Sequence, residues 1–199
     1  MRRKPAEALL IDFDGVLRHH DAAAYGDFEA RHGIAPAALL ASGLEWARQL
    51  PAITGHITRQ QWLDSIAEHT GASAAALTEW DAYRGYVDET VLAFVREARA
   101  AGRRVGLATN ATDDLHDDLA RFGLSDAFDA VFSSADMGVH KPAREYFGQA
   151  CRTLETPPSL CLFVDDTDRN IRGARAAGLL AARWNGPDDL RYLRGALGL

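Results

Sequence analysis

Two aspartates separated by one residue, Asp12 and Asp14, directly follow a short apolar run near the N-terminus. Residues two apart on an extended segment point the same way, so both carboxylates should face one crevice while Phe13 turns into the core. One acid can then stay ionised as a nucleophile while the other, its pKa raised by the neighbouring charge, protonates a leaving oxygen. Gly15 permits a tight bend that brings backbone N–H groups close to an anion. Two turn-forming aspartates at a strand end are the plain structural alternative.

A second pair of aspartates, Asp165 and Asp166, follows another apolar run far along the chain. With the first pair it would gather up to four carboxylates, which cannot all stay ionised without compensation. A divalent cation resolves this repulsion, and a few oxygen ligands with room for water and a phosphate oxygen favour Mg²⁺ over calcium or zinc. An EF-hand loop beginning at Asp166 is excluded, because its sixth residue is Ile171 and its twelfth is Ala177.

Three further residues could hold phosphoryl oxygens. Thr109 offers a hydroxyl, Lys141 offers a positive point charge, and the backbone N–H of Asn110 lies just before a predicted helix. Each has an ordinary explanation alone, because a threonine at a strand end is often a cap and a lysine before proline is often solvated. Their position beside the aspartate pairs is what suggests phosphate chemistry.

The apolar runs before these residues are nearly continuous, which is typical of strands in a parallel sheet that is covered on both faces. The predicted strands are 8–12, 105–109, 130–133, 160–164 and 179–184. Helical patterns alternate with them, over 87–101, 113–122 with Thr112 as N-cap, 142–154 with Pro142 in the first turn, 168–177 and 188–197. This order predicts the α/β class, an open parallel Rossmann-like sheet with helices on both faces. The polar residues all fall at carboxyl ends of strands, where such sheets bind ligands.

About 90 residues separate the first two predicted strands, although a crossover needs only a dozen or so. Helical candidates fill this interval, over 22–32, 36–50, 59–70 and 73–84, and they are broken at Gly33, Pro51, Gly55 and Gly71. No strand pattern occurs among them. The sequence therefore predicts an α/β core, residues 1–18 and 87–199, that carries an inserted all-helical cap, residues 19–86.

Composition narrows the class of protein. With 199 residues, 47% of them hydrophobic, the chain can bury a full core, which excludes disorder. The net charge of −6 argues against a nucleic-acid partner. No apolar run approaches the roughly 20 residues of a membrane span, and the basic start, residues 1–4, precedes a run too short for a signal peptide, so a cytoplasmic location is expected. Cys151 and Cys161 are predicted to be core residues. Oligomeric state stays open.

Four motifs, in this order, resemble those of the haloacid dehalogenase superfamily of phosphotransferases and hydrolases. They are DFDGVL at 12–17, LATN at 107–110, KP at 141–142 and FVDDTDRNI at 163–171. The last, continuing to Gly178, is the most specific, and the resemblance covers the core half of the chain. A helical insertion directly after the first motif is similar to the family's first cap type. TGHIT at 54–58 and the doubled aspartate resemble relatives of sugar-phosphate phosphatases and of the phosphatase domain of epoxide hydrolases.

The resemblance implies a Mg²⁺-dependent phosphatase that hydrolyses a small phosphorylated metabolite. Asp12 would attack phosphorus and form an aspartyl-phosphate, while Asp14 would protonate the departing alcohol and then activate water. Mg²⁺ would be held by the Asp12 carboxylate, the Asp14 backbone carbonyl and Asp166, with Asp165 behind them. Asn170 stands where some relatives carry another aspartate.

The same resemblance assigns the phosphate-binding residues. Thr109 and Lys141 would neutralise the phosphoryl oxygens and so take part in catalysis, and Phe13, Gly15 and Asn110 would complete the set around the phosphate. We expect no membrane partner.

Three other functions fit parts of this pattern. A phosphomutase uses the same groups but returns the phosphoryl group to its product. A non-catalytic binding domain could retain the fold, although the full set of polar residues disfavours it. A 2-haloacid dehalogenase is the weakest alternative, because the family's dehalogenases lack an acid two residues after the nucleophile and Asp14 is present here.

Several cap residues have two explanations. Trp46, Trp62 and Trp80 either form an apolar lid over a substrate or pack within the cap and against the core. Arg48 and Arg59 either contact a second anionic group on the substrate or are ordinary exposed helix residues.

The helix predicted over 113–122 begins with a cluster of aspartates. Negative charge is favoured at a helix N-terminus by the macrodipole, so a solvated acidic face is sufficient to explain them. The cluster consists of Asp113, Asp114, Asp117 and Asp118.

Overall fold

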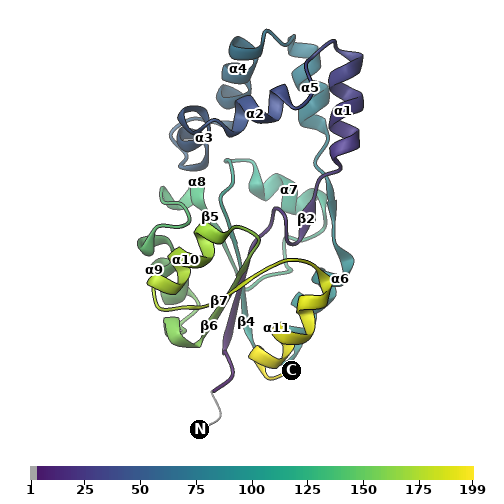
Figure 1. The fold of residues 1–199 in the computed structure, drawn as a ribbon. Coiled ribbons are helices and arrows are strands. Elements are labelled where there is room, and N and C mark those ends of the chain that lie inside the picture. Colours follow the sequence, from purple (N-terminus) through teal and green to yellow (C-terminus); the bar gives the residue numbers. More distant parts are fainter. Residues whose placement is uncertain (1–3) are drawn as a thin grey trace.

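A five-stranded parallel sheet forms the centre of the structure, a computed structural model that describes residues 4–199 (Figure 1). Its strands are β1 (Ala8–Ile11), β4 (Arg104–Thr109), β5 (Ala130–Ser133), β6 (Cys161–Asp165) and β7 (Leu180–Arg183). They lie in the order β5-β4-β1-β6-β7, and each neighbouring pair is parallel. Strand β1 therefore lies where the strand order reverses, the place at which open α/β sheets bind ligands. The predicted fold class and all five predicted strands are confirmed.

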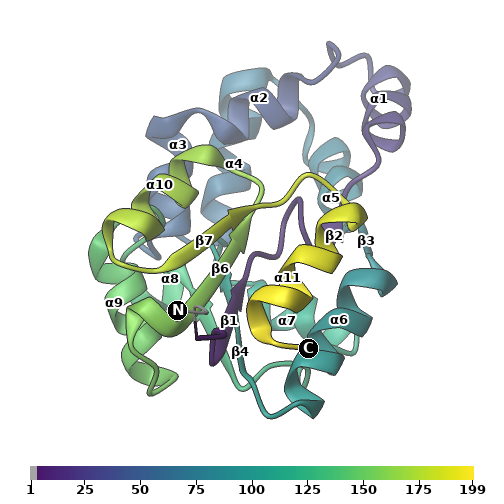
Figure 2. The same cartoon turned by 60° about the horizontal axis from the view of Figure 1, so that its bottom comes forward.

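Helices cover both faces of this sheet (Figure 2). They are α6 (Glu89–Ala100), α7 (Leu115–Arg121), α8 (Ser134–Met137), α9 (Arg144–Thr153), α10 (Asp168–Ala176) and α11 (Leu190–Leu197), with 3₁₀ turns η1 (Pro158–Leu160) and η2 (Pro187–Asp189). In β1, Leu9 belongs to one buried cluster with Phe94 of α6 and Leu193 of α11. The next residue, Leu10, belongs to another with Phe147 of α9. Successive strand residues thus face opposite helical layers, which is why the strands are apolar throughout.

Between β1 and α6 the chain forms a separate group of five helices above the carboxyl ends of the strands (Figure 1). This helical insertion consists of α1 (Ala22–Arg31), α2 (Ala38–Leu44), α3 (Trp46–Ile53), α4 (Arg59–Thr70) and α5 (Ala74–Ala82). It has a buried cluster of its own, made of Phe28, Leu39, Leu63, Ile66, Ala76, Leu77 and Trp80. The antiparallel strands β2 (Arg18–His19) and β3 (Tyr86–Val87) bring its two ends together.

The tryptophans of the insertion have different surroundings. Trp80 is buried in the insertion's own cluster, so the packing explanation applies to it. Trp62 packs against the same cluster, with its ring centroid 6.1 Å from that of Trp80, but it also lines a cavity beside Asp14. Trp46 is half-exposed and lies between the insertion and the rest of the chain. Its ring is 5.4 Å from that of His140 and 5.6 Å from the Arg169 guanidinium carbon.

Two predictions about helix breaks in the insertion were wrong. The helix expected over 36–50 is two helices, α2 and α3, which are separated at Glu45, where the backbone is extended. Pro51 does not end a helix but lies inside α3, two residues before its end. A proline so close to the end of a short helix removes one intrahelical hydrogen bond without dividing the element.

Four predicted helix starts in the rest of the chain were too early. Helix α6 begins at Glu89 rather than at residue 87, which belongs to β3. Helix α7 begins after Asp114, because the Thr112 hydroxyl donates to the Asp114 carboxylate at 2.6 Å instead of capping the backbone. Helix α9 begins at Arg144, beyond Pro142, and α11 begins at Leu190 after a 3₁₀ turn. Strands β2 and β3 were not predicted, since two residues are too few to show a period.

Cys151 and Cys161 are both free and buried, as predicted for core residues. Within residues 4–199, no helix combines the length and the apolar character needed to cross a membrane. Residues 1–3 of the basic start lie outside the described residues.

Candidate active site

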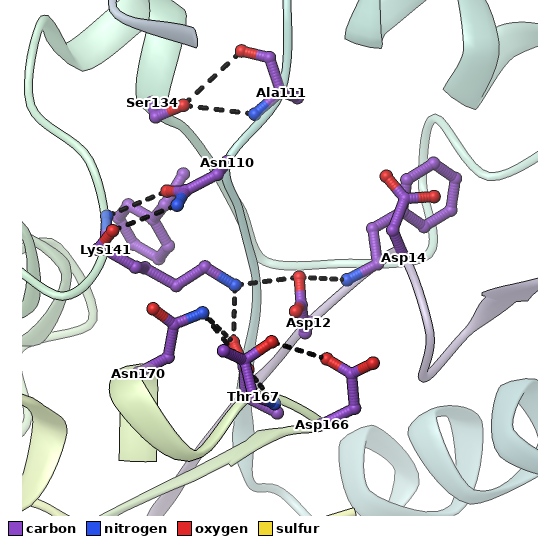
Figure 3. Close-up of polar contacts among 12 residues, drawn as sticks. Asp12, Asp14, Asn110, Ala111, Ser134, Lys141, Asp166, Thr167 and Asn170 are labelled. Carbon is purple, nitrogen blue, oxygen red and sulfur yellow. Dashed lines mark hydrogen bonds and ion pairs between the residues drawn. The ribbon is translucent and has the colours of Figure 1, made fainter. Parts of the chain in front are cut away.

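The polar residues singled out in the sequence meet at the carboxyl ends of β1, β4 and β6 (Figure 3). Asp12 directly follows β1, and Asp165 ends β6. Ile11 pairs with Leu107, so Thr109, the last residue of β4, lies level with Phe13. Lys141 arrives from the loop between α8 and α9. Residues as far apart in the sequence as Asp12 and Asp165, more than 150 positions, therefore lie in one site. This agrees with the expectation that ligands bind at the carboxyl ends of the strands.

The Lys141 side chain is 1% exposed and lies between two carboxylates. Its Nζ is 2.8 Å from Asp12 Oδ1 and 2.6 Å from Asp165 Oδ2. Burial alone would lower the pKa of Lys141, but Asp12 and Asp165 outweigh it, so the pKa is raised and the ammonium group stays charged. This buried lysine is not the solvated surface residue that its position before a proline allowed.

Asn110 holds the backbone of Lys141 through its side chain. Lys141 N–H donates to Asn110 Oδ1 at 2.8 Å, and Asn110 Nδ2 donates to the Lys141 carbonyl at 3.0 Å. The next backbone N–H, of Ala111, donates to Ser134 Oγ at 3.1 Å, which fixes the loop after β4 (Figure 3). Only the backbone N–H of Asn110 was expected to take part, and this side-chain clamp was not predicted, because nothing in the spacing links residues 110 and 141.

Asp165 is fully buried, and its oxygens already have partners. Oδ1 accepts from Thr167 N–H at 2.8 Å, and both oxygens lie within 3.2 Å of Asn170 Nδ2. Asp165 also accepts from Lys141 Nζ. This set of donors fixes the Asp165 carboxylate in place. Asp165 is therefore suited to orient Lys141, which agrees with the position behind the metal ligands that the family resemblance implies.

Asp12, Asp165 and Asp166 each offer a carboxylate oxygen, and these atoms all lie within 4.8 Å of one another. Gly15 permits this approach: its φ is +81°, and a Cβ there would lie 2.2 Å from Asp166 Oδ2. Burial raises the pKa of Asp12 well above its usual value, Asp165 adds to the rise, and Lys141 opposes it. The three carboxylates carry more negative charge than the single Lys141 ammonium offsets, and carboxylate oxygens are ligands that Mg²⁺ prefers. The cluster therefore fits a divalent cation such as Mg²⁺.

Asp12 and Asp14 have different partners, contrary to the expectation that they point the same way. The Asp12 carboxylate lies near Lys141, and it also accepts from Phe13 N–H at 2.7 Å. The Asp14 carboxylate turns away from that of Asp12 (Figure 3). It accepts two hydrogen bonds from Arg18. The reason is that β1 ends at Ile11, so strand alternation does not extend through residues 12–14. Phe13 is buried in the core as expected.

Comparison with known proteins assigns the family. A model of the family described as haloacid dehalogenase-like hydrolase matches residues 6–178. The chain belongs to this family. The family resemblance read from the four motifs is thus confirmed.

The curated relatives of this haloacid dehalogenase-like hydrolase include phosphatases. A phosphoserine phosphatase of Thermus thermophilus is 35% identical over 91 residues, which is 45% of this chain and 36% of that protein. A ribulose-1,5-bisphosphate 5-phosphatase of Halopiger xanaduensis is 33% identical over 121 residues, 56% of this chain and 51% of that protein. The chain thus spans about half or less of these relatives.

A solved structure from Bacteroides thetaiotaomicron has the same fold. It is a wild-type haloacid dehalogenase-family enzyme in complex with magnesium and inorganic phosphate, and it superposes with a TM-score of 0.74 at 22% identity, covering 89% of this chain and 93% of that one.

The acidic start of α7 in this haloacid dehalogenase-like hydrolase is a solvated face at Asp113 and Asp117, which are exposed as predicted, but not at Asp114 and Asp118, which form ion pairs. Arg18 Nη1 donates to Asp118 Oδ2 at 2.5 Å, and Arg84 Nη1 lies 2.8 Å from Asp114 Oδ2. Burial alone would raise the pKa of Asp114, but Arg59, the Thr112 hydroxyl and Arg84 together hold it below its usual value. Helix α7 thus belongs to an ion-pair network that reaches both the Asp14 loop and the helical insertion.

Proposed function

We propose that the chain is a Mg²⁺-dependent phosphatase that hydrolyses a small phosphorylated metabolite through an aspartyl-phosphate on Asp12. The observation that carries the proposal is the buried Lys141 ammonium between Asp12 and Asp165, with an Asp166 oxygen within 4.8 Å of theirs. The names of the curated relatives support phosphate-ester hydrolysis, and a structural neighbour holds magnesium and phosphate. In this proposal residues 19–86 act as a cap on a core of residues 1–18 and 87–199.

The acidic cluster would hold the metal. The carboxylates of Asp12 and Asp166, with the Asp14 backbone carbonyl, are the proposed ligands, and Asp165 orients Lys141 behind them. Bound Mg²⁺ would supply positive charge that offsets the charge of the phosphoryl oxygens. Lys141 Nζ, the Thr109 hydroxyl and the backbone N–H of Asn110 would bind these oxygens from the protein side. The Gly15 N–H, which the sequence also suggested, donates to the Arg18 carbonyl at 2.9 Å instead.

The reaction then proceeds in two displacements. An Asp12 carboxylate oxygen attacks phosphorus, the bond from phosphorus to the ester oxygen breaks, and the departing oxygen takes a proton from Asp14. In the second step Asp14 accepts a proton from water, whose oxygen attacks phosphorus and releases inorganic phosphate and free Asp12. Asp14 lines the space between the site and the helical insertion, which is where a leaving alcohol would lie.

A phosphate-release screen over phosphate monoesters, with and without Mg²⁺, tests the proposal. We expect release that requires Mg²⁺ and that Asp12→Asn abolishes, because an amide is a poor nucleophile. Asp27→Asn is the matched control, since Asp27 is an exposed aspartate on α1, in the helical insertion. Retained turnover in Asp12→Asn would remove Asp12 from its proposed role.

Other results would replace the proposal by a different function. Recovery of a product bisphosphate, with the phosphoryl group returned to it, would indicate a phosphomutase. Folded protein that is inert toward every phosphate ester with Mg²⁺ present would indicate a binding domain. Halide release that resists a chelator would indicate a dehalogenase.

A further inference from the structure

A cavity of about 130 Å³ lies between the proposed phosphate site and the helical insertion. Asp14 and Asn110 line it on the sheet side. The insertion contributes Leu44, Gln49, Ala52, Ile53, Arg59 and Trp62. It is the space next to the proposed leaving-group acid, so the organic part of a substrate would lie here.

Arg59 is the cation of the insertion that reaches this cavity, and its guanidinium is already paired. Its Nη2 lies 2.5 Å from Asp81 Oδ1, and its Nε lies 3.2 Å from Asp114 Oδ2. The remaining nitrogen, Nη1, donates to the Thr112 hydroxyl at 3.1 Å. All three nitrogens thus have oxygen partners from the chain, and a substrate anion would have to displace a carboxylate to use them.

Arg18, the other arginine in the lining, is paired in the same way. It donates to both oxygens of Asp14, at 2.7 and 2.9 Å, and to Asp118 at 2.5 Å. Arg48, which the sequence also suggested for a second anion, does not line the cavity. It pairs with Glu45 and donates to the Ser42 carbonyl.

The charge of the lining disfavours a second anion. Three carboxylates face two guanidinium groups in the lining, which consists of Asp14, Asp114 and Asp118 against Arg18 and Arg59. Adding the next pair of the network, Asp81 and Arg84, leaves the same excess of one negative charge. Like charges a few ångströms apart repel each other, so an added carboxylate or phosphate in this cavity would be destabilised.

The uncharged part of the lining indicates what does fit. Leu44, Ala52, Ile53 and Trp62 form an apolar wall. Gln49 is the uncharged hydrogen-bonding side chain of this wall, since the Trp62 indole already donates to the Gly43 carbonyl. Such a wall binds a short neutral chain with one hydroxyl or carbonyl group.

We infer that the preferred substrates carry one anionic group, the reacting phosphate, on a small uncharged organic part that packs against the apolar wall of the cavity. This inference rests on the proposed phosphatase function. The ion pairs of Arg59 and Arg18 exclude carboxylated and doubly phosphorylated esters by leaving no cation free to receive the second charge.

Two phosphate esters with the same number of carbon atoms test the inference. We expect glycerol 3-phosphate to have a kcat/KM at least about tenfold above that of 3-phosphoglycerate, which adds a carboxylate in the cavity. p-Nitrophenyl phosphate reports general phosphatase activity. If none of the three esters releases phosphate, the proposed function fails. If they are hydrolysed but 3-phosphoglycerate equals or exceeds glycerol 3-phosphate, the substrate inference fails and the function stands.

A variant that removes one carboxylate partner of Arg59 tests whether the ion pairs cause the preference for substrates without a second anionic group. Asp81→Asn removes one partner of Arg59 and should narrow the ratio between the two esters several-fold, by improving 3-phosphoglycerate. Glu45→Gln is the matched control, because it frees Arg48 outside the cavity and should leave the ratio unchanged. Equal effects of the two variants would overturn the assignment to Arg59.

Binding gives a second readout without turnover. In Asp12→Asn protein, calorimetry with Mg²⁺ should show tighter binding of glycerol 3-phosphate than of 3-phosphoglycerate. An equal or reversed order of affinity would overturn the inference whatever the turnover experiment shows.

Discussion

The Arg18 guanidinium donates to both carboxylate oxygens of Asp14, from Nε at 2.7 Å and from Nη2 at 2.9 Å. Its third nitrogen donates to Asp118 of α7 at 2.5 Å. Asp14 itself is 44% exposed, whereas Arg18 is largely buried between its two partners. A two-point contact fixes the direction of a carboxylate better than a single hydrogen bond does. Arg18 therefore acts as a positioning residue for the proposed leaving-group acid.

Replacement of Arg18 should slow the hydrolysis of some esters more than of others. An alkyl leaving group needs a proton from Asp14, whereas p-nitrophenolate departs without one. We expect Arg18→Gln to lower kcat/KM for an alkyl phosphate about tenfold or more relative to p-nitrophenyl phosphate. Steady-state kinetics with both esters provide the measurement.

Arg84→Gln is the control for that experiment. Arg84 contacts Asp114 and Asp118 in the same network but not Asp14, so its loss should affect both esters alike. An equal fall for both esters in Arg18→Gln would assign Arg18 a purely structural role.

The ion pairs of Asp114 should make stability depend on pH. Its folded-state pKa is lowered, so its contribution is fully present above the unfolded pKa of about 3.9 and is lost as pH falls through the lower folded value. We expect Asp114→Asn to reduce the free energy of unfolding by about 1–3 kcal/mol at pH 7, and the difference from wild type to shrink progressively as pH falls below the unfolded pKa of about 3.9.

Urea unfolding of both proteins between pH 3 and 7 measures this dependence. Asp117→Asn is the matched control, because Asp117 is an exposed aspartate in the first turn of the same helix. A difference between Asp114→Asn and wild type that stayed constant with pH would show that the ion pairs do not cause it.

The strands of the sheet could be predicted because a strand that is buried on both faces is apolar at nearly every position. In β6, residues 161–164 are apolar and buried without alternation, and Asp165 interrupts the run at the carboxyl end where ligands bind. The topology of parallel strands then brings Asp12 and Asp165 together, whereas Lys141 comes from the loop between α8 and α9, and its place beside them was implied by the family resemblance. Local pattern and general sheet geometry were sufficient for the strands and the two aspartates.

The remaining features depend on pairs that the spacing of residues does not reveal. Arg18 and Asp118 are 100 residues apart, and no periodicity relates a guanidinium after the first strand to a carboxylate in the first turn of α7. For that reason the aspartates at the start of α7 looked like a solvated face. The direction of Asp14 was missed for a similar reason, since it depends on where β1 ends and on which cation lies beside it.

The Tyr146 hydroxyl should contribute to stability. It is fully buried and donates to the Phe132 carbonyl at 2.6 Å, next to the end of β5. Tyr146→Phe leaves that carbonyl without this donor, and we expect the free energy of unfolding to fall by about 1–3 kcal/mol. Tyr192→Phe is the control, because Tyr192 is 63% exposed and its hydroxyl can bond to water. Denaturant unfolding distinguishes the two variants, and equal stability would contradict the expectation.

The contact of Gly15 with Asp166 should control metal affinity. In Gly15→Ala the new Cβ would lie 2.2 Å from Asp166 Oδ2, so the carboxylate must move. We expect the Mg²⁺ concentration for half-maximal phosphate release to rise about tenfold or more, the range seen when the support of a metal ligand is lost. Gly102→Ala has a similar backbone cost, since φ is +78°, but its Cβ would meet nothing within 4 Å. An equal Mg²⁺ requirement in both variants would attribute the effect to backbone strain alone.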